Sequence, residues 1–335
     1  MRFLSGAIIL ILMIGPVKAQ NISSIPVVNG VSWELASYRK KSISNLNYKM
    51  EVTIPSIPSV PITGTTEFTF NLNDISQDIQ IDFKADKDQI KSVRANGKRQ
   101  QINHYNEHIV ITRNALNIGE NKIKIKYVAG DDALNRSGNF LYTLFVPDRM
   151  RTSFPSFDQP NLKATFELTL KVPESWETMS SAPIARESSR NLKKTVRFRK
   201  SDKMSTYLFS FVAGRFNKIE ANIDGLEMTM LHREPDAEKM NRNVEEIFRL
   251  HKASIDYMEE YTGIKYPFQK FGFVLIPSFQ FGGMEHVGAI QYKDSTLVLD
   301  KNPSTTDLLA RASLIGHETS HMWFGDLVTM DWFDD

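Results

Sequence analysis

The sequence predicts an α+β protein, in which an N-terminal antiparallel β sandwich precedes a part that contains helices and strands. The length of 335 residues exceeds one ordinary hydrophobic core and indicates about two domains. Apolar and polar residues alternate through the first two thirds of the chain, and a helical period replaces this alternation after about residue 219. We therefore place one domain at 20–218 and a second at 219–335.

The first residues have the pattern of a secretory signal. Arg2 precedes an apolar run at 7–14, and the small residue Ala19 ends the segment. The run is shorter than the roughly 20 apolar residues of a transmembrane helix. We predict a signal peptide over 1–19, export to the periplasm or the extracellular space, and no stable membrane insertion after cleavage. An uncleaved anchor is the alternative.

Residues 45 to about 216 predict the sandwich, because many short alternating runs follow one another without a helical pattern between them. Turn residues such as Asn96-Gly97 separate the runs. A last apolar strand is predicted at 207–212. The alternating apolar residues are Leu46, Tyr48, Met50, Val52 and Ile54, then Phe68, Phe70 and Leu72, then Ile123, Ile125 and Tyr127, and then Phe166, Leu168, Leu170 and Val172.

Two helices and two strands are predicted in the second domain. An apolar face predicts a helix at 236–262 that Gly263 ends. His251 lies within this face, and we interpret it as a packed core residue. Strands are predicted at 272–276 and 289–292. Ser304 and Asp307 have the spacing of a capping box and open a second helix, which we expect to reach about residue 325.

Charge and cysteine content exclude several classes of function. The net charge is +2, and Lys and Arg form no basic stripe, so we expect no nucleic acid partner. The chain has no cysteine, which excludes disulfides and thiolate metal ligands. Any bound metal must therefore be held by histidines and carboxylates.

The segment HETSH in the second helix is an instance of HExxH. With about 100° of rotation per residue, His317 and His321 lie one turn apart on the same side, so both imidazoles can reach one ion. Glu318 lies beside them, where it can act on a water held by that ion. The opposite face is predicted to pack into the domain and consists of Leu308, Ala312, Ile315 and Met322.

This pattern predicts zinc-dependent peptide hydrolysis. Zinc bound by two histidines and a carboxylate keeps a position for water and lowers its pKa to about 7. Glu318 would take the proton and pass it to the leaving amine. Chance proximity of two surface histidines and a glutamate is the alternative. A metzincin is excluded, because Phe324 and Leu327 stand where its glycine and third histidine are required.

A second segment precedes this helix. The paired glycines Gly282 and Gly283 and the lone carboxylate Glu285 indicate backbone that a ligand approaches closely. An ordinary loop with a solvated charge is the alternative.

Taken together, FGGMEHVGAI and HETSHMWFGDLVTMDW resemble the aminopeptidase N family of gluzincin metallopeptidases, with its GxMEN and HExxH-WFG-N-x-VT motifs. The segment RTSFPSFDQPNLKA at 151–164 resembles the FPCFDEPxxKA segment of that family. The resemblance covers roughly 25–335. It implies that the second domain is the start of a thermolysin-like catalytic domain, in which one Zn2+ is bound by His317 and His321, with Glu318 as general base.

The resemblance also implies substrate-binding residues. Glu285 would hold the free α-ammonium group of a peptide. The physical argument agrees, because a carboxylate that faces a buried ammonium is left unpaired by a blocked N-terminus. Gly282, Gly283 and Met284 would line the substrate backbone as a strand edge. His286 replaces the Asn that is usual in the family, which affects binding on the primed side or the hydrogen bonding of the strand. Leu144 and Val146 replace a Gln and a Glu of a YTQFEP-like segment, so selectivity for the first residue differs.

The third zinc ligand of the family is a Glu nineteen residues after the second histidine. This is position 340, beyond Asp335, and we expect a WLNEG-like stretch there. Asp331, Asp334 and Asp335 are not expected to substitute for it. With two ligands, this chain alone is expected to bind zinc weakly and to turn over little.

The sequence therefore predicts a zinc aminopeptidase that releases N-terminal residues from peptides with a free N-terminus. One alternative is a thermolysin-like endopeptidase, which Glu285 disfavours because it would obstruct a longer chain. The other is an inactive fragment that acts at most as a binding module, with apolar surface exposed where further helices should pack.

Overall fold

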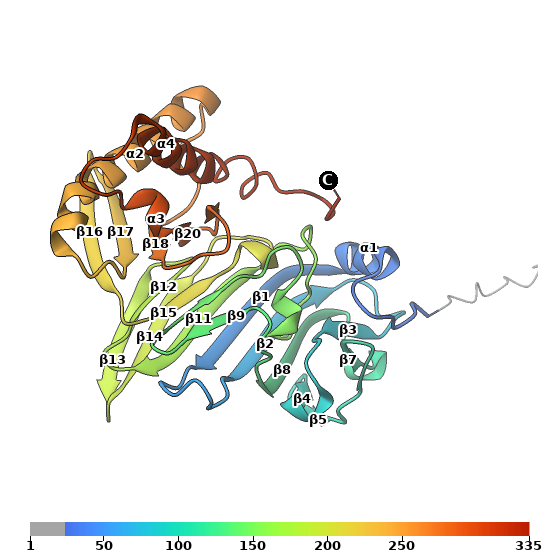
Figure 1. Cartoon of the computed structure of the whole chain (residues 1–335). Helices are drawn as coiled ribbons and strands as arrows, with labels where there is room; N and C mark the ends of the chain where they lie inside the picture. Colours follow the sequence, from blue (N-terminus) through green and yellow to red (C-terminus); the bar gives the residue numbers. More distant parts are fainter. Residues whose placement is uncertain (1–23, 335) are drawn as a thin grey trace, which may run out of the picture.

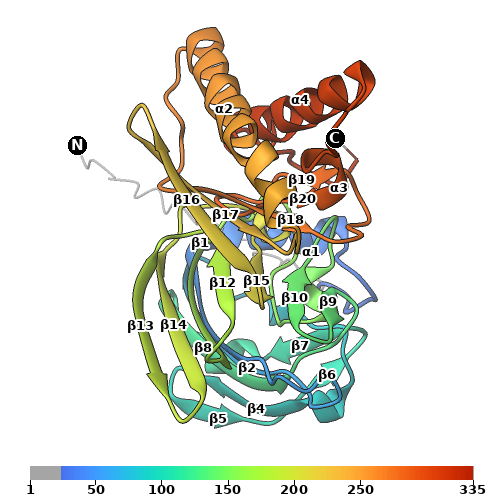
Figure 2. The ribbon, with the colours of Figure 1, turned by 60° about the vertical axis from the view of Figure 1, so that its left-hand side comes forward.

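The computed structural model describes residues 24–334, so the predicted signal peptide lies outside the described part. Figures 1 and 2 show a large body of β-strands, coloured blue to yellow, and a smaller part of helices and strands, coloured gold to red, on one end of it. This arrangement confirms the predicted α+β class. Within residues 24–334, no helix combines the length and the apolar character needed to cross a membrane.

An eight-stranded sheet forms most of the β body. Its strands, in spatial order, are β13 (Ile184–Arg190), β14 (Lys193–Lys200), β11 (Thr165–Pro173), β1 (Ile43–Thr53), β2 (Thr63–Leu72), β8 (Gly119–Val128), β4 (Ile90–Ala95) and β5 (Lys98–Gln100). The predicted alternation is confirmed in β1, where Tyr48, Met50 and Val52 are buried. The sheet is not wholly antiparallel, because β1 and β11 run parallel.

Two smaller sheets complete the body. The four-stranded sheet has the order β12 (Glu177–Ser180), β15 (Phe211–Gly214), β10 (Phe140–Thr143) and β9 (Leu134–Ser137), and the three-stranded sheet has the order β3 (Ile79–Asp82), β7 (His108–Ile111) and β6 (His104–Tyr105). Phe166 of β11 stacks on Phe209, which leads into β15, with ring centroids 4.1 Å apart. The large sheet and the four-stranded sheet therefore share a hydrophobic core.

The predicted strand at 207–212 is wrong in its first half. Residues Thr206–Leu208 form the 3-10 turn η4, and β15 begins only at Phe211. Almost every residue in this run is buried, so its apolar pattern cannot distinguish a strand from a turn. The other short 3-10 turns are η1 (Lys87–Gln89), η2 (Arg113–Ala115) and η3 (Met150–Thr152).

Helix α1 (Trp33–Ser42) was not predicted. Its start is capped by the Ser32 side chain, which accepts a hydrogen bond from the Leu35 N–H. The helix lacks a continuous apolar face, and one of its buried residues is the charged Arg39. A sequence pattern based on hydrophobic period therefore could not reveal it.

The second part contains a five-stranded sheet and three helices. The sheet order is β16 (Asn217–Ile223), β17 (Leu226–His232), β18 (Phe271–Ile276), β20 (Ile290–Lys293) and β19 (Gly283–Met284), and the helices are α2 (Ala237–Thr262), α3 (Asp294–Leu297) and α4 (Thr305–Ser320). Asp236 caps the start of α2, and the left-handed Gly263 ends it, as predicted. His251 is fully buried and stacks on Phe273, which confirms it as a core residue.

Strand β18 joins the two parts of the molecule through its opposite faces. Phe271, Phe273 and Leu275 pack in a core with α2. Val274 and Ile276 point the other way and belong to the core of the β body. The interface between the two parts therefore has an apolar core, and the β body lies beneath the five-stranded sheet.

Candidate metal centre

Helix α4 carries the HExxH residues, and local sequence sets both of its ends. Ser304 and Asp307 exchange hydrogen bonds between their side chains and backbone N–H groups, which confirms the predicted capping box. The helix ends at Ser320 instead of near residue 325, because the chain tightens into shorter turns and then reverses at Gly325, with φ 143°. A Cβ at Gly325 would lie 2.9 Å from His321 Nδ1, so glycine allows this turn to lie against the ring.

The buried side of α4 differs in part from the prediction. Ile315 and Met322 are buried as expected, but Leu308 is 42% exposed, so its predicted burial is wrong. Arg311 occupies the inner row instead. Its guanidinium donates to Asn243 Oδ1 of α2 at 2.8 Å, and this pairing allows a charged residue to take a core position.

His317 of α4 and His321, which caps the C-terminal end of that helix, turn their rings toward each other. His317 Nε2 and His321 Nε2 lie 3.2 Å apart, and the planes of the rings are 87° apart. Two nitrogen ligands at about 2.0–2.1 Å from a tetrahedral zinc ion lie roughly 3.3 Å from each other. His321 Nδ1–H donates to the Phe324 carbonyl at 3.0 Å, which leaves the lone pair of Nε2 free to face His317. These donors fit a shared divalent metal ion.

Glu318 lies on the inner side of the same helix and is only 4% exposed. Burial, and secondarily the nearby charge of Glu285, raise its pKa to about 8. A cation at the histidines would oppose this effect and favour the carboxylate. The carboxylate packs directly over Gly283, where a Cβ would overlap it. The paired glycines therefore allow β19 to approach α4.

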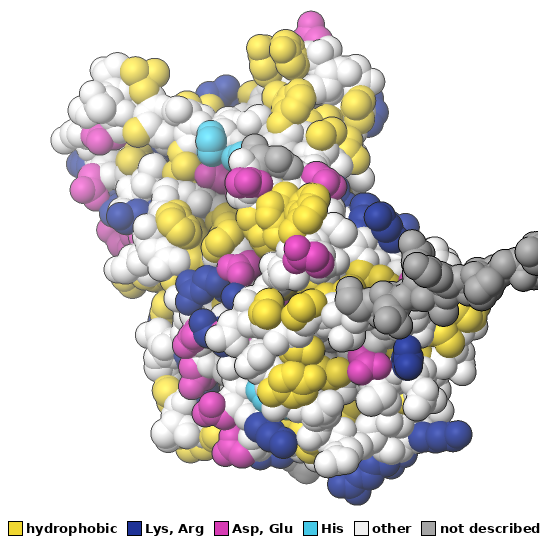
Figure 3. Space-filling view, turned by 90° about the vertical axis from the view of Figure 1, so that its right-hand side faces the viewer, with side chains coloured by type: hydrophobic (Ala, Val, Ile, Leu, Met, Phe, Trp, Pro, Cys, Tyr) yellow, Lys and Arg dark blue, Asp and Glu magenta, His cyan; other side chains and the backbone are white. Residues whose placement is uncertain are grey.

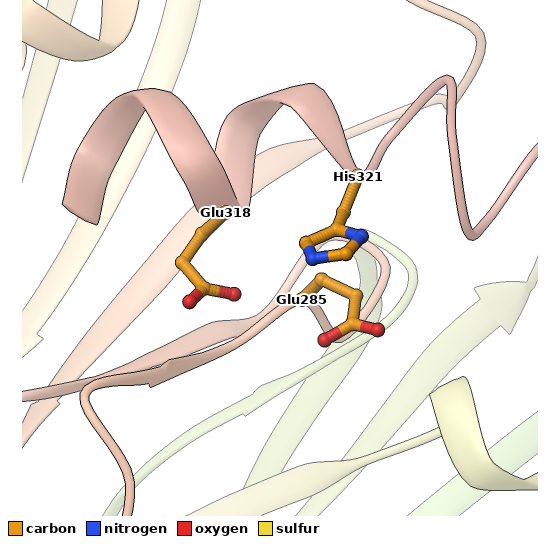
Figure 4. Close-up of side chains that lie close together, drawn as sticks. All are labelled: Glu285, Glu318 and His321. Atoms are coloured by element: carbon orange, nitrogen blue, oxygen red, sulfur yellow. The ribbon is translucent and has the colours of Figure 1, made fainter. Parts of the chain in front are cut away.

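Glu285 joins these residues from β19 and the turn that follows. Ligand atoms of Glu285, Glu318 and His321 all lie within 4.8 Å of one another. Figure 4 shows Glu318 and His321 extending down from the helix, with the Glu285 side chain just below the His321 ring and its carboxylate directed downward in this view. Figure 3 shows histidine and acidic side chains together at the narrow region between the β body and the smaller part. The structure thus brings together four of the residues that the sequence singled out.

The remaining predicted residues are placed differently. Gly283 and Met284 form β19, which pairs antiparallel with Tyr292 and Gln291. His286 is fully buried, and its Nδ1 lies 3.3 Å from the Leu208 carbonyl of the β body. Burial lowers its pKa to about 3, so the imidazole is neutral at pH 7. His286 therefore lies in the domain interface and not among the converging ligand atoms.

Asp326 is a buried residue near the centre that the sequence analysis overlooked. It is 1% exposed, and within residues 24–334 neither carboxylate oxygen has a hydrogen-bond partner. Burial, with Glu285 next in importance, raises its pKa well above the usual range. The family pattern has Asn at this place, which was the available signal. Lys163 of the segment 151–164 donates to the Asp326 and Leu327 carbonyls and so connects that segment to the turn after α4.

In these features, an HExxH helix lies over an edge strand and the Glu285 carboxylate follows that strand, an arrangement that fits a metallopeptidase. Family models support this in two stretches, with the Peptidase M1 N-terminal domain matching residues 44–208 and the Peptidase family M1 domain matching residues 247–335. The chain belongs to the M1 family of peptidases.

Several relatives are named aminopeptidases. The chain is 34% identical over 219 residues to Probable aminopeptidase 2 of Sulfurisphaera tokodaii, a match that covers 64% of this chain and 27% of that protein. It is 32% identical over 254 residues to Probable aminopeptidase 1 of the same organism, covering 74% and 32%. Glutamyl aminopeptidase of Homo sapiens is 35% identical over 191 residues, covering 56% and 20%. The chain thus spans a third or less of the length of these relatives.

Proposed function

We propose that the protein containing this chain is a zinc-dependent aminopeptidase that releases N-terminal residues from peptides. One observation carries the proposal: ligand atoms from His321, Glu318 and Glu285 lie within 4.8 Å of one another, with His317 Nε2 3.2 Å from His321 Nε2. Two imidazoles are suitable ligands for a metal ion. Of the two carboxylates beside them, one can accept a proton and the other can pair with a cationic group of the substrate. The names of the relatives support the same activity.

The proposed cofactor is one Zn2+ held by His317 and His321. When bound, the ion supplies Lewis-acid chemistry, since it acidifies water and polarises a carbonyl oxygen. Glu318 takes a proton from water at a carboxylate oxygen and donates it to the leaving amine. Its buried position over Gly283 holds that oxygen still and keeps it away from bulk solvent.

Glu285 is the proposed anchor for the α-ammonium group of the substrate. An ammonium group pairs with the carboxylate, whereas an acetylated N-terminus leaves the charge without a partner, at a cost of about 1–3 kcal/mol or more. Gly282, Gly283 and Met284 supply the strand edge for the first residues of the peptide. Because the peptide must end at Glu285, only one residue is released at a time.

The test compares a peptide with a free N-terminus and its N-acetylated form, using the whole protein that the gene encodes. We expect cleavage of the free peptide only. Glu285→Gln should lower kcat/KM for the free peptide about 10- to 100-fold. Zinc content by atomic absorption should stay unchanged, because Glu285 is not a proposed ligand. Equal cleavage of both peptides would show a thermolysin-like endopeptidase instead.

Export of the protein is also a proposal, and it rests on the charged and apolar pattern of residues 1–19. The mature protein should then begin at Gln20. N-terminal sequencing of protein recovered from outside the cytoplasm tests this, and a chain that still begins at Met1 would contradict it. The division into domains at 20–218 and 219–335 likewise stays a proposal.

A further inference from the structure

The turn that carries Glu285 is weakly held by its own sheet. Strand β19 has two residues and lies at the sheet edge, where, among the described strands, it pairs with β20 alone. Beyond Glu285 the chain turns back at once, with the Ala289 N–H bonded to the His286 carbonyl. So few backbone bonds cannot by themselves fix a side chain to the accuracy that substrate positioning requires.

Additional bonds come from the β body beneath the turn. His286 Nδ1–H donates to the Leu208 carbonyl of η4 at 3.3 Å. Gln291 Nε2–H, which lies opposite Met284 in the β19–β20 pair, donates to the Thr143 carbonyl of β10 at 3.1 Å. Both side chains are fully buried. One flanks Glu285 directly, and the other holds the strand to which the Glu285 segment is paired.

Lys270 makes a third connection. Its ammonium group donates to the Ser180 carbonyl of β12 at 3.3 Å and also to the Gly288 carbonyl within the turn. Gly288, with φ 64°, allows the turn to pack closely against the β body beside Ser181, since a Cβ there would lie 3.0 Å from the Ser181 carbonyl oxygen. All the acceptors are backbone carbonyl groups, so a rigid β framework and not a flexible side chain defines the position.

We infer that Lys270, His286 and Gln291 are positioning residues, through which the N-terminal β body sets the place of Glu285 and thus the point where a peptide must end. This inference rests on the proposed role of Glu285. It assigns to the β body a part in exopeptidase specificity, in addition to packing. It also gives His286 a role in the interface, where its Nδ1–H reaches the Leu208 carbonyl.

A double-mutant cycle tests the inference with the whole protein. Lys270→Met keeps the length of the side chain and removes the ammonium group. In the native background we expect it to raise KM for a free-amine peptide about tenfold, with a smaller change in kcat. In the Glu285→Gln background, where no anchor remains to be positioned, we expect a change in KM of less than about twofold.

Gln269→Leu is the matched control. Gln269 Nε2–H also donates across the interface, to the Lys200 carbonyl at 3.0 Å, but its side chain is exposed and this hydrogen bond does not involve the turn. It should leave KM unchanged in both backgrounds. If Lys270→Met does not fold, as judged by its unfolding transition, Gln291→Met provides the same test with a side chain of similar size.

The outcomes are distinct. An equal rise in KM in both backgrounds would show that the residue does not act through Glu285, and an unchanged KM in the native background would show that it positions nothing; either result overturns the inference. If Glu285→Gln itself leaves the preference for free over acetylated peptides intact, the proposed function fails instead.

Discussion

The carboxylate of Glu318 lies where a side chain at residue 283 would be if that residue were not glycine. This contact explains one of the two adjacent glycines by sterics alone. The other, Gly282, has more room, since a Cβ there would lie 3.3 Å from a terminal methyl carbon of Leu314. At the scale of single residues, the lack of a Cβ at Gly283 therefore leaves the space that the carboxylate of Glu318, the proposed base, occupies.

Gly283→Ala should displace the Glu318 carboxylate and lower kcat roughly 10- to 100-fold, because small displacements of a catalytic group have large effects. Zinc content should not change. Gly282→Ala is the comparison variant: its kcat should change less than about threefold, since the flexible Leu314 side chain can move, whereas its proposed place on the peptide-binding edge should affect KM. Steady-state kinetics on both variants decide the matter, and a Gly283→Ala enzyme with native kcat would contradict the steric argument.

At the scale of elements, a buried ionic cluster holds α1 to the β body. Arg39 of α1 pairs with Asp82 at the end of β3, and His108 Nδ1 of β7 lies 2.9 Å from the same carboxylate. Burial alone would raise the pKa of Asp82, but the charge of Arg39, together with the close His108 ring and the hydrogen bonds from Arg39, lowers it to about 2. The negative charge is thus favoured in the folded state.

This shift predicts a dependence of stability on acid. The pKa of Asp82 is depressed from 3.8 to about 2, so its stabilisation is complete above the unfolded value and is lost as the pH falls from about 4 to 2. The contribution is about 2 kcal/mol. Urea unfolding should show that the free energies of unfolding of the native protein and of Asp82→Asn differ. This difference should shrink by about 2 kcal/mol as the pH falls from about 4 to 2. A difference that does not vary with pH would contradict the prediction. Asp88→Asn, which removes one carboxylate from the surface, is the control.

At the scale of the whole molecule, the two parts share an interface with an apolar core. Val274 and Ile276 of β18 are fully buried in the core of the β body, while their neighbours Phe273 and Leu275 pack under α2. Unfolding either part would expose one face of the same strand. The second part should therefore depend on the first for its stability.

Calorimetry should accordingly show a single unfolding transition for both parts. Val274→Ala should lower the midpoint of that one transition. Truncating this buried aliphatic side chain should reduce the free energy of unfolding by about 1–3 kcal/mol. Two transitions, of which only one moves in the variant, would show that the parts unfold independently.

Much of the local structure of this protein is determined by residues that lie close together in the sequence. Periodicity predicted the strands with strict alternation. Short-range hydrogen bonds and a left-handed glycine explain the predicted start of α4 and end of α2. The helical period also predicted that His317, Glu318 and His321 follow one another along a single helical turn. His251 could likewise be interpreted as a core residue from its place in an apolar face. The family motifs added the pairing of this helix with Glu285.

The tertiary structure alone decided the rest. Helix α1 depends on a partner for Arg39 forty-three positions away, and the burial of Arg311 depends on Asn243 in another helix. His286 and Asp326 differ from the family motifs, but the sequence does not show that both are buried, His286 against the Leu208 carbonyl of the β body. Such placements depend on which distant surfaces pack together, and no local pattern of residues records that.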